Sequence, residues 1–302
     1  MCLFPSLFIL SCSPRKTWHS STFVYFDTIC ELRLFCLSSE YASAQQEVQR
    51  TFSAIESLFS PGSRDLSSPE VVHLYRRALD VYHNSEGCFD ITVGPLTKVW
   101  GFLEKSYHIP KKEELDRALT YVGMDKIKEN NGVLALEARM ELDWGGVAKG
   151  FGIDMLYQRL VSSGIERGYI NAGGDLRCWG ENPDNETWKV GIKHPRKTGY
   201  LGILSISDLA AATTGDYQRF FEKDGVRYHH VFDPRTGYPA RGKQSVTVIG
   251  PETLICDALS TALFVCDRPE DVLKKYPQYG AIIVDSLGKI QVLGKSYPFH
   301  LI

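Results

Sequence analysis

Apolar residues recur along this chain with two different spacings, and these predict where helices and strands form. Residues 39–59 carry apolar side chains three or four positions apart, which predicts an amphipathic helix. A second helix is predicted over 69–87, beginning near a proline and stopping at a glycine. Further helices are predicted within 111–123, from 147 onward, and over 252–266.

Strand patterns fill much of the remaining sequence. Alternation over 22–36 predicts one half-buried strand, and Asn131-Gly132, Asp224-Gly225 and the turn at 286–288 each predict a hairpin. Other strands are predicted near 168–173, 188–194, 201–207 and 245–250. No Pro/Ser-rich linker, charge block or internal repeat divides the body. We therefore predict an α+β fold: a single compact domain over residues 21–302, with mixed and antiparallel sheets flanked by helices.

The first twenty residues differ from the rest. An apolar run from Leu3 to Leu10 ends in a lipobox-like Leu-Ser-Cys-Ser, which predicts a leader over 1–20, lipidation at Cys12 and export. The protein would then be lipid-anchored at the outer, periplasmic face of the cytoplasmic membrane. No Lys or Arg precedes the apolar run, so an ordinary buried segment is the alternative.

Composition narrows the function classes. The net charge of −2 gives no basic footprint, so no nucleic-acid partner is expected. None of the eight cysteines forms a CxxC pair, so a zinc site or a thioredoxin-like site has no support. We interpret the cysteines of the body as small buried hydrophobic residues.

The stretch Glu141–Asp154, "ELDWGGVAKGFGID", places Asp143 and Lys149 around a glycine-rich turn before a predicted helix. Its spacing fits neither a P-loop nor a dinucleotide-fold fingerprint. Glycines nevertheless allow close approach of a ligand, and free amides at a helix N-terminus favour an anion. The structural alternative is a simple turn with Asp143 as the helix cap.

Three other segments carry polar residues at strand ends. Asp90 precedes Gly94-Pro95, and Asn171 precedes the glycine pair 173–174. Thr214 stands in Thr-Thr-Gly, and His230 comes three residues before the turn Asp-Pro-Arg-Thr-Gly. A histidine in that position suits a general base, although each of these features alone also suits a structural turn.

Asp257 and Thr261 are four residues apart, so they share a face of the last long helix. A carboxylate and a hydroxyl offer hard oxygens to Mg2+, which takes few protein ligands and completes its shell with phosphate and water. The alternative is a threonine bonded back to a helix carbonyl. Together with the glycine turns and His230, this pair suits phosphoryl transfer, in which catalysis is largely positioning and charge neutralisation.

These motifs resemble one known family. The segments "GCFDITVGPL", "DWGGVAKGFGID", "INAGGD", "TTGDYQRFFEKDGVRYHHVFDPRTGYP" and "DALSTALFV" look like the FAD:protein FMN transferases of the ApbE type, in family order. The resemblance implies a compact α+β fold that binds FAD with Mg2+. It also implies transfer of FMN to a Thr or Ser hydroxyl of an acceptor protein, with release of AMP. Typical acceptors are subunits of flavin-dependent redox complexes in the membrane.

The resemblance also implies residue roles. Asp257 and Thr261 would bind the metal through side chains, the carbonyl of Gly146 would be a third ligand, and His230 would activate the acceptor hydroxyl. The residues implied in FAD binding are Phe26, Cys88, Phe89, Asp90, Asp143, Lys149, Asn171, Thr214 and Val231. This chain departs from the family at Phe26-Asp27-Thr28, where Met-Gly-Thr is usual, and in a short segment between the first two helices.

Two other functions remain open at this stage. FAD hydrolysis would use water in place of the acceptor hydroxyl and give FMN and AMP. A flavin-binding lipoprotein would hold the cofactor without reacting.

Overall fold

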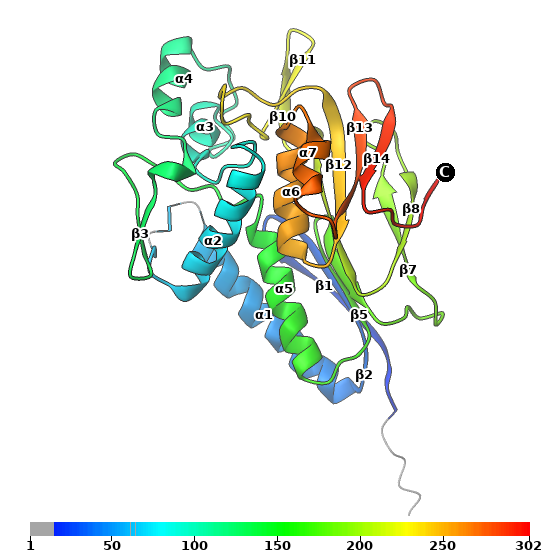
Figure 1. Cartoon of the computed structure of the whole chain (residues 1–302). Helices are drawn as coiled ribbons and strands as arrows, with labels where there is room; N and C mark the ends of the chain where they lie inside the picture. Colours follow the sequence, from blue (N-terminus) through cyan, green and yellow to red (C-terminus); the bar gives the residue numbers. More distant parts are fainter. Residues whose placement is uncertain (1–14, 61, 64) are drawn as a thin grey trace, which may run out of the picture.

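An eight-stranded antiparallel sheet forms the centre of the protein (Figure 1). The computed structural model describes residues 15–302 except 61 and 64. The strands lie in the order β1-β2-β5-β6-β9-β12-β13-β14, and each pairing between neighbours is antiparallel. Their bounds are β1 Thr17–Tyr25, β2 Thr28–Cys36, β5 Gly168–Ala172, β6 Asp175–Trp179, β9 Leu209–Gly215, β12 Lys243–Gly250, β13 Gly280–Asp285 and β14 Ile290–Gly294.

The predicted strand over 22–36 is wrong in one respect, because a turn divides it. Tyr25 pairs with Thr28, and the two residues between them, Phe26 and Asp27, have φ of 56° and 53°. Two consecutive left-handed residues match the tight turns that suit twisted hairpins. Phenylalanine is uncommon in that conformation, so residue type did not indicate a turn here. β1 also begins at Thr17, four residues before the boundary drawn at 21, whereas Cys12 lies outside the described residues.

Helices cover one face of the large sheet (Figure 1). α5 contacts β5 and β6, α6 contacts β9 and β12, and α1 packs on the first hairpin and on α5. The long helices were predicted; the short α3 and α7 were not. The bounds are α1 Ser38–Phe59, α2 Pro69–Asn84, α3 Gly94–Val99, α4 Lys112–Leu119, α5 Ala148–Ser162, α6 Thr253–Val265 and α7 Pro269–Lys274. Among the described residues, none of the helices combines the length and apolarity needed to cross a bilayer.

A three-stranded sheet packs on the other face. It has the order β15-β8-β7, with β7 Trp188–Lys193, β8 Tyr200–Ile206 and β15 Phe299–Leu301. Leu176 and Cys178 of β6 join Trp188 and Leu204 in the core between the sheets. β6 and most of β12 are therefore buried on both faces, so they lack the alternation by which a half-buried strand is recognised.

Two small hairpins complete the fold at the predicted turns. β3 (Lys128–Asn130) pairs with β4 (Val133–Ala135), and β10 (Phe220–Lys223) pairs with β11 (Val226–His229). The second hairpin packs through Phe221 and Tyr228 against a cluster centred on Trp100. The α+β prediction is confirmed, with antiparallel pairing in all the sheets described.

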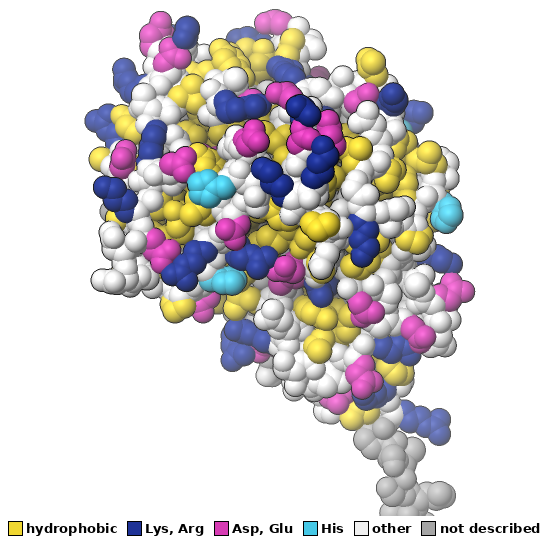
Figure 2. Space-filling model, in the orientation of Figure 1, with side chains coloured by type: hydrophobic (Ala, Val, Ile, Leu, Met, Phe, Trp, Pro, Cys, Tyr) yellow, Lys and Arg dark blue, Asp and Glu magenta, His cyan; other side chains and the backbone are white. Residues whose placement is uncertain are grey.

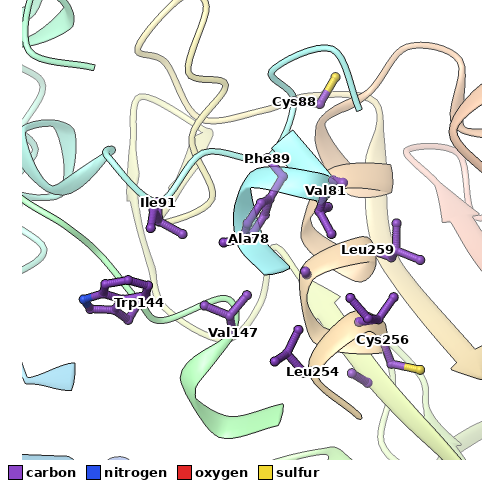
Figure 3. Packing of buried hydrophobic residues seen from close by; sticks show 14 of the residues in the cluster. Ala78, Val81, Cys88, Phe89, Ile91, Trp144, Val147, Leu254, Cys256 and Leu259 are labelled. Carbon is purple, nitrogen blue, oxygen red and sulfur yellow. The ribbon is translucent and has the colours of Figure 1, made fainter. Parts of the chain in front are cut away.

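α5 and α6 approach each other at Gly150. A Cβ at this position would lie 2.6 Å from the carbonyl oxygen of Thr253 and 2.7 Å from Cα of Leu254. The helices also bond to each other: Asp154 of α5 accepts from the backbone N–H groups of Thr253 (3.0 Å) and Leu254 (2.9 Å). In return, Asp257 of α6 accepts from the N–H of Gly150 at 3.2 Å. Val147, Leu254 and Cys256 belong to the packed core around this contact (Figure 3).

We predict that Gly150→Ala destabilises the protein by about 1–3 kcal/mol, because the added methyl would push two helix backbones apart. Gly152→Ala is the matched control, since its Cβ would meet only side chains at 3.4 Å or more. Better helix propensity should leave that variant within about 1 kcal/mol of the wild type. Urea unfolding of both variants checks this, and equal stabilities would contradict the backbone contact.

Candidate active site

The N-terminal turn of α5 meets the middle of α6 and the ends of β5, β6 and β9. This junction brings together Gly146, Lys149, Thr214, Asp257 and Thr261, which were predicted from separate segments. His230 directly follows β11, and the carboxylate of Asp143 in the glycine turn acts on it electrostatically. We refer to this junction as the candidate site.

Lys149 lies between two buried carboxylates. Its Nζ is 3.0 Å from Oδ2 of Asp175 and 3.6 Å from Oδ2 of Asp257, and it donates to the carbonyl of Gly145 at 3.0 Å. Burial alone would lower the pKa of Lys149, but the two carboxylates raise it above its usual value. Burial and the neighbouring Asp175 raise the pKa of Asp257 to about 7. The candidate site therefore holds Lys149 charged.

Hydroxyl groups line the side of this cluster nearest β9. Thr214 Oγ1 lies 2.6 Å from Ser260 Oγ and 3.1 Å from Thr261 Oγ1. Gly146 faces the same place, since a Cβ there would come within 3.3 Å of Thr261 Oγ1. The missing side chain leaves the Gly146 backbone and the Thr261 hydroxyl side by side.

The donor set at this junction suits Mg2+. Nowhere among the described residues do three His, Cys, Asp or Glu side chains form a metal cluster. A metal ion would therefore depend on the hydroxyl and carbonyl oxygens beside Asp257, which are the hard ligands magnesium prefers. Asp175 Oδ2 is buried without a hydrogen bond of good geometry, so the site retains unused negative charge despite the nearby ammonium.

Asp143 does not cap α5, so that interpretation was wrong. The residue before the helix is Val147, which makes no side-chain cap. Asp143 instead accepts from the hydroxyl of Thr97 at 2.8 Å and from the N–H of Gly145 at 2.9 Å. It fixes the glycine turn to α3. The later amides of Val147 and Ala148 donate to the carbonyl of Trp144, at 3.0 and 2.9 Å.

The loop after α2 turns its side chains into the protein. Asp90 is 7% exposed and accepts from the N–H of Thr92 at 2.7 Å and from its hydroxyl. Cys88 is buried beside Cys266, and Phe89 enters the core among Ala78 and Val81 (Figure 3). Asp90 and Cys88 thus shape this loop, whereas the Phe89 ring also reaches Gly146, where a Cβ would lie 3.2 Å from it.

The other predicted FAD contacts lie at turns. Asn171 Oδ1 accepts from the N–H of Gly174 at 3.0 Å, which closes the β5–β6 turn. Phe26 packs edge-on against Phe52 beside Gly152 of α5. Val231 is buried, and its N–H donates to Nδ1 of His229 at 3.3 Å. Direct FAD contacts of these side chains stay predictions.

The adjacent histidines have different environments. His229 is 3% exposed and bonds through Nε2 to the carbonyl of Ala240 at 2.8 Å; burial lowers its pKa to about 4. His230 is half-buried, and its Nδ1 lies 3.2 Å from the carbonyl of Arg219. Desolvation and the nearby Arg219 lower the pKa of His230 to about 3. Because a carbonyl only accepts, Nδ1 carries the proton and Nε2 keeps a free lone pair.

Sequence reasoning missed Asp175 and Arg219. Asp175 directly follows the glycine pair 173–174, so a carboxylate at the start of a strand after that turn was the available signal. Arg219 holds His230 through its backbone, and its charge acts on both His230 and Lys149. Only the fold brings these residues to the α5–α6 contact.

The family model for the ApbE family matches residues 26–283, which includes every element of the candidate site. The chain belongs to the ApbE family. The FAD:protein FMN transferase of Haemophilus influenzae is 31% identical over 221 residues, covering 69% of this chain and 64% of that protein. The chain thus aligns with less than two thirds of that relative's length.

Two further comparisons cover more of this ApbE-family chain. The FAD:protein FMN transferase of Treponema pallidum is 29% identical over 308 residues, covering 89% of this chain and 85% of that protein. The crystal structure of the ApbE protein of Thermotoga maritima superposes with a TM-score of 0.85 at 29% identity, covering 92% of this chain and 97% of that one.

We predict that Lys149→Met in this ApbE-family protein costs up to about 3 kcal/mol, because it leaves two buried carboxylates without a cation. Adding Asp175→Asn should recover most of that loss. Lys98→Met is the control, since Lys98 and Glu141 form an exposed pair whose loss should cost under about 1 kcal/mol. Chemical unfolding at pH 8 measures all three, and a Lys149 variant as stable as the Lys98 variant would refute the charge cluster.

We also predict that stability falls as pH is lowered from 6.5 toward 4. The unfolded chain protonates His229 near pH 6.5, whereas the folded protein resists until about pH 4. Between pH 6 and 5, the free energy of unfolding of His229→Gln should therefore fall less steeply than that of the wild type, by about 1 kcal/mol per pH unit. Urea unfolding at both pH values checks this; parallel slopes would exclude a neutral buried His229.

Proposed function

We propose that this chain transfers FMN from FAD to a Thr or Ser hydroxyl of an acceptor protein, with Mg2+ and release of AMP. The relatives named above as FAD:protein FMN transferases support the reaction. The observation that carries the proposal is the candidate site itself: Lys149 held between Asp175 and Asp257, beside the Gly146 backbone and the Thr261 hydroxyl. This arrangement joins a fixed cation to hard oxygen ligands, as a pyrophosphate substrate with a divalent metal requires.

The metal would be held by Asp257, Thr261 and the carbonyl of Gly146. When bound, Mg2+ neutralises charge on phosphate oxygens. The residues present favour a cation, because two carboxylates and one ammonium leave a net negative charge in a buried place. Lys149 would orient the pyrophosphate, and Asp143 would keep the glycine turn in place for it.

His230 would take the proton of the acceptor hydroxyl. The Nδ1 bond to the Arg219 carbonyl leaves the Nε2 lone pair of the neutral imidazole free to accept that proton. The hydroxyl oxygen then bonds to the phosphorus on the FMN side. The pyrophosphate P–O bond breaks, AMP leaves with the electron pair, and the hydroxyl proton passes to Nε2.

The acceptor we propose is a subunit of a membrane flavin-dependent redox complex, met at the periplasmic face by a lipid-anchored enzyme. The apolar leader with Cys12 motivates the anchor. Metabolic labelling with a radioactive fatty acid, compared between wild type and Cys12→Ala, tests it. Equal labelling of the two would refute lipidation at Cys12.

The deciding experiment measures AMP formed from FAD, with Mg2+ or with chelator, in the presence and absence of purified candidate acceptor subunits. Covalent flavin is then imaged by gel fluorescence. Mg2+-dependent AMP together with a fluorescent acceptor band is the expected result. AMP without labelling, across several acceptors, would indicate FAD hydrolysis, and FAD binding without AMP would indicate a flavin-binding lipoprotein.

We predict that His230→Ala lowers the transfer rate at least about 100-fold and leaves FAD affinity within about threefold of the wild type, since it removes the base and not the pyrophosphate site. His300→Ala, at an exposed position in β15, is the control and should retain full activity. Quenched time-course assays measure the transfer rate, and FAD titration measures the affinity. Retained transfer in the His230 variant would refute its role as base.

A further inference from the structure

A small basic cavity lies beside His229, apart from the candidate site. Its volume is about 120 Å³, and its walls include Arg196, Asp216, Arg227, His229, Arg241 and Lys243. The residue after His229 is His230, the proposed base, which does not line the cavity. Asp216 likewise follows Gly215, where β9 ends beyond Thr214. The cavity therefore shares two segments with the candidate site without sharing its side chains.

The cations in the wall outnumber the carboxylates that face them. Arg196 binds both oxygens of Asp216, at 2.7 and 2.5 Å, and Arg227 lies 3.6 Å from the same carboxylate. Arg227 is also paired with the exposed Glu222 at 3.0 Å. Two carboxylates thus serve two arginines, whereas Arg241 and Lys243 form no ion pair at contact distance with any described residue. Asp267 and Glu270 act on Lys243 from farther away.

Arg241 and Lys243 bond only to neutral partners in the described structure. Arg241 donates to the carbonyl of Arg227 at 3.0 Å, and Lys243 donates to the carbonyl of Cys266 at 2.6 Å, just after α6. Burial lowers the pKa of Lys243, so its charge is held against a desolvation cost. His229 adds no charge at neutral pH, because its pKa is about 4.

The size and charge of the cavity limit which ligand it can hold. The cavity has room for a few water molecules or one oxyanion group, and not for a nucleobase or a flavin ring. The wall draws guanidinium groups from Arg196, Arg227 and Arg241 and an ammonium group from Lys243, and such groups bind phosphate and carboxylate. Asp216 keeps Arg196 and Arg227 in fixed orientations, so the site is organised before any anion enters.

We infer that this cavity is a subsite for one oxyanion group, a carboxylate or a phosphate, held chiefly by Arg241 and Lys243. Two sources carry that chemistry: an acidic side chain of the acceptor protein, or a free phosphate-bearing molecule. The first source rests on the proposed transfer reaction. Anion binding itself does not depend on that reaction.

Inorganic phosphate is the first probe, titrated into the FAD-free protein by calorimetry. We expect a Kd on the order of 1 mM for the wild type, about tenfold weaker binding for Arg241→Gln/Lys243→Gln, and about threefold weaker binding for Arg241→Gln alone. Arg241→Gln alone is included because it keeps the bond of Lys243 to the end of α6, which the double variant loses. Arg268→Gln/Lys274→Gln removes two exposed charges on and beside α7 and should bind like the wild type.

A pair of threonine peptides then identifies the source of the anion. One carries a glutamate and the other a glutamine at the same place. A lower KM for the glutamate peptide, abolished in the Arg241/Lys243 variant, assigns the cavity to the acceptor. If the two peptides have equal KM values and phosphate binds more weakly to the variants, the cavity is assigned to a free phosphate-bearing molecule. Phosphate affinity that is absent in the wild type, or equal in all variants, overturns the proposal even if FMN transfer is confirmed.

Discussion

The reciprocal bonding of α5 and α6 is the contact on which the rest of the site depends. Asp154 of α5 accepts from the first N–H groups of α6, and Asp257 of α6 accepts from the N–H of Gly150. Each helix thus satisfies backbone donors of the other, which would otherwise be buried without partners. The bonds require the backbones to touch, and glycine at position 150 makes this possible.

This contact also sets the electrostatics. Because α5 and α6 meet near the first turn of α5, Lys149 is carried to within 3.6 Å of Asp257, and the β5–β6 turn adds Asp175 on its other side. A buried ammonium with two carboxylates is stable only if its geometry is fixed. The helix crossing fixes it and leaves the hydroxyls of Thr214 and Thr261 on the adjoining side.

The sequence predicted elements whose cause is local. The helix periodicity of α1 and α2, and the Asn-Gly and Asp-Gly hairpins, depend on neighbours along the chain, and the structure has them at the predicted places. Predictions failed where a distant contact decides. Phe26 takes a left-handed conformation although its residue type disfavours it, and its ring packs on Phe52 of α1.

The candidate site divides in the same way. Helix spacing was enough to place Asp257 and Thr261 on one face, and the glycine-rich turn was enough to single out Lys149. A helix cap was the structural alternative for Asp143, because acids often precede helices, but Thr97 of α3, far away in sequence, binds its carboxylate. Asp175 had no local sign of its ion pair, because β6 reaches Lys149 only through the order of strands in the sheet.

The position of α6 in the chain has a consequence for how the protein is made. α6 contacts α2, α5, β9 and β12, yet it spans Thr253–Val265, so most of the chain leaves the ribosome before it exists. Until then, α5 lacks the partner that accepts from Gly150, and β9 and β12 lack the helix that packs on them. The nascent protein must therefore stay soluble with one face of its central sheet uncovered, and its candidate site cannot form until α6 has been made.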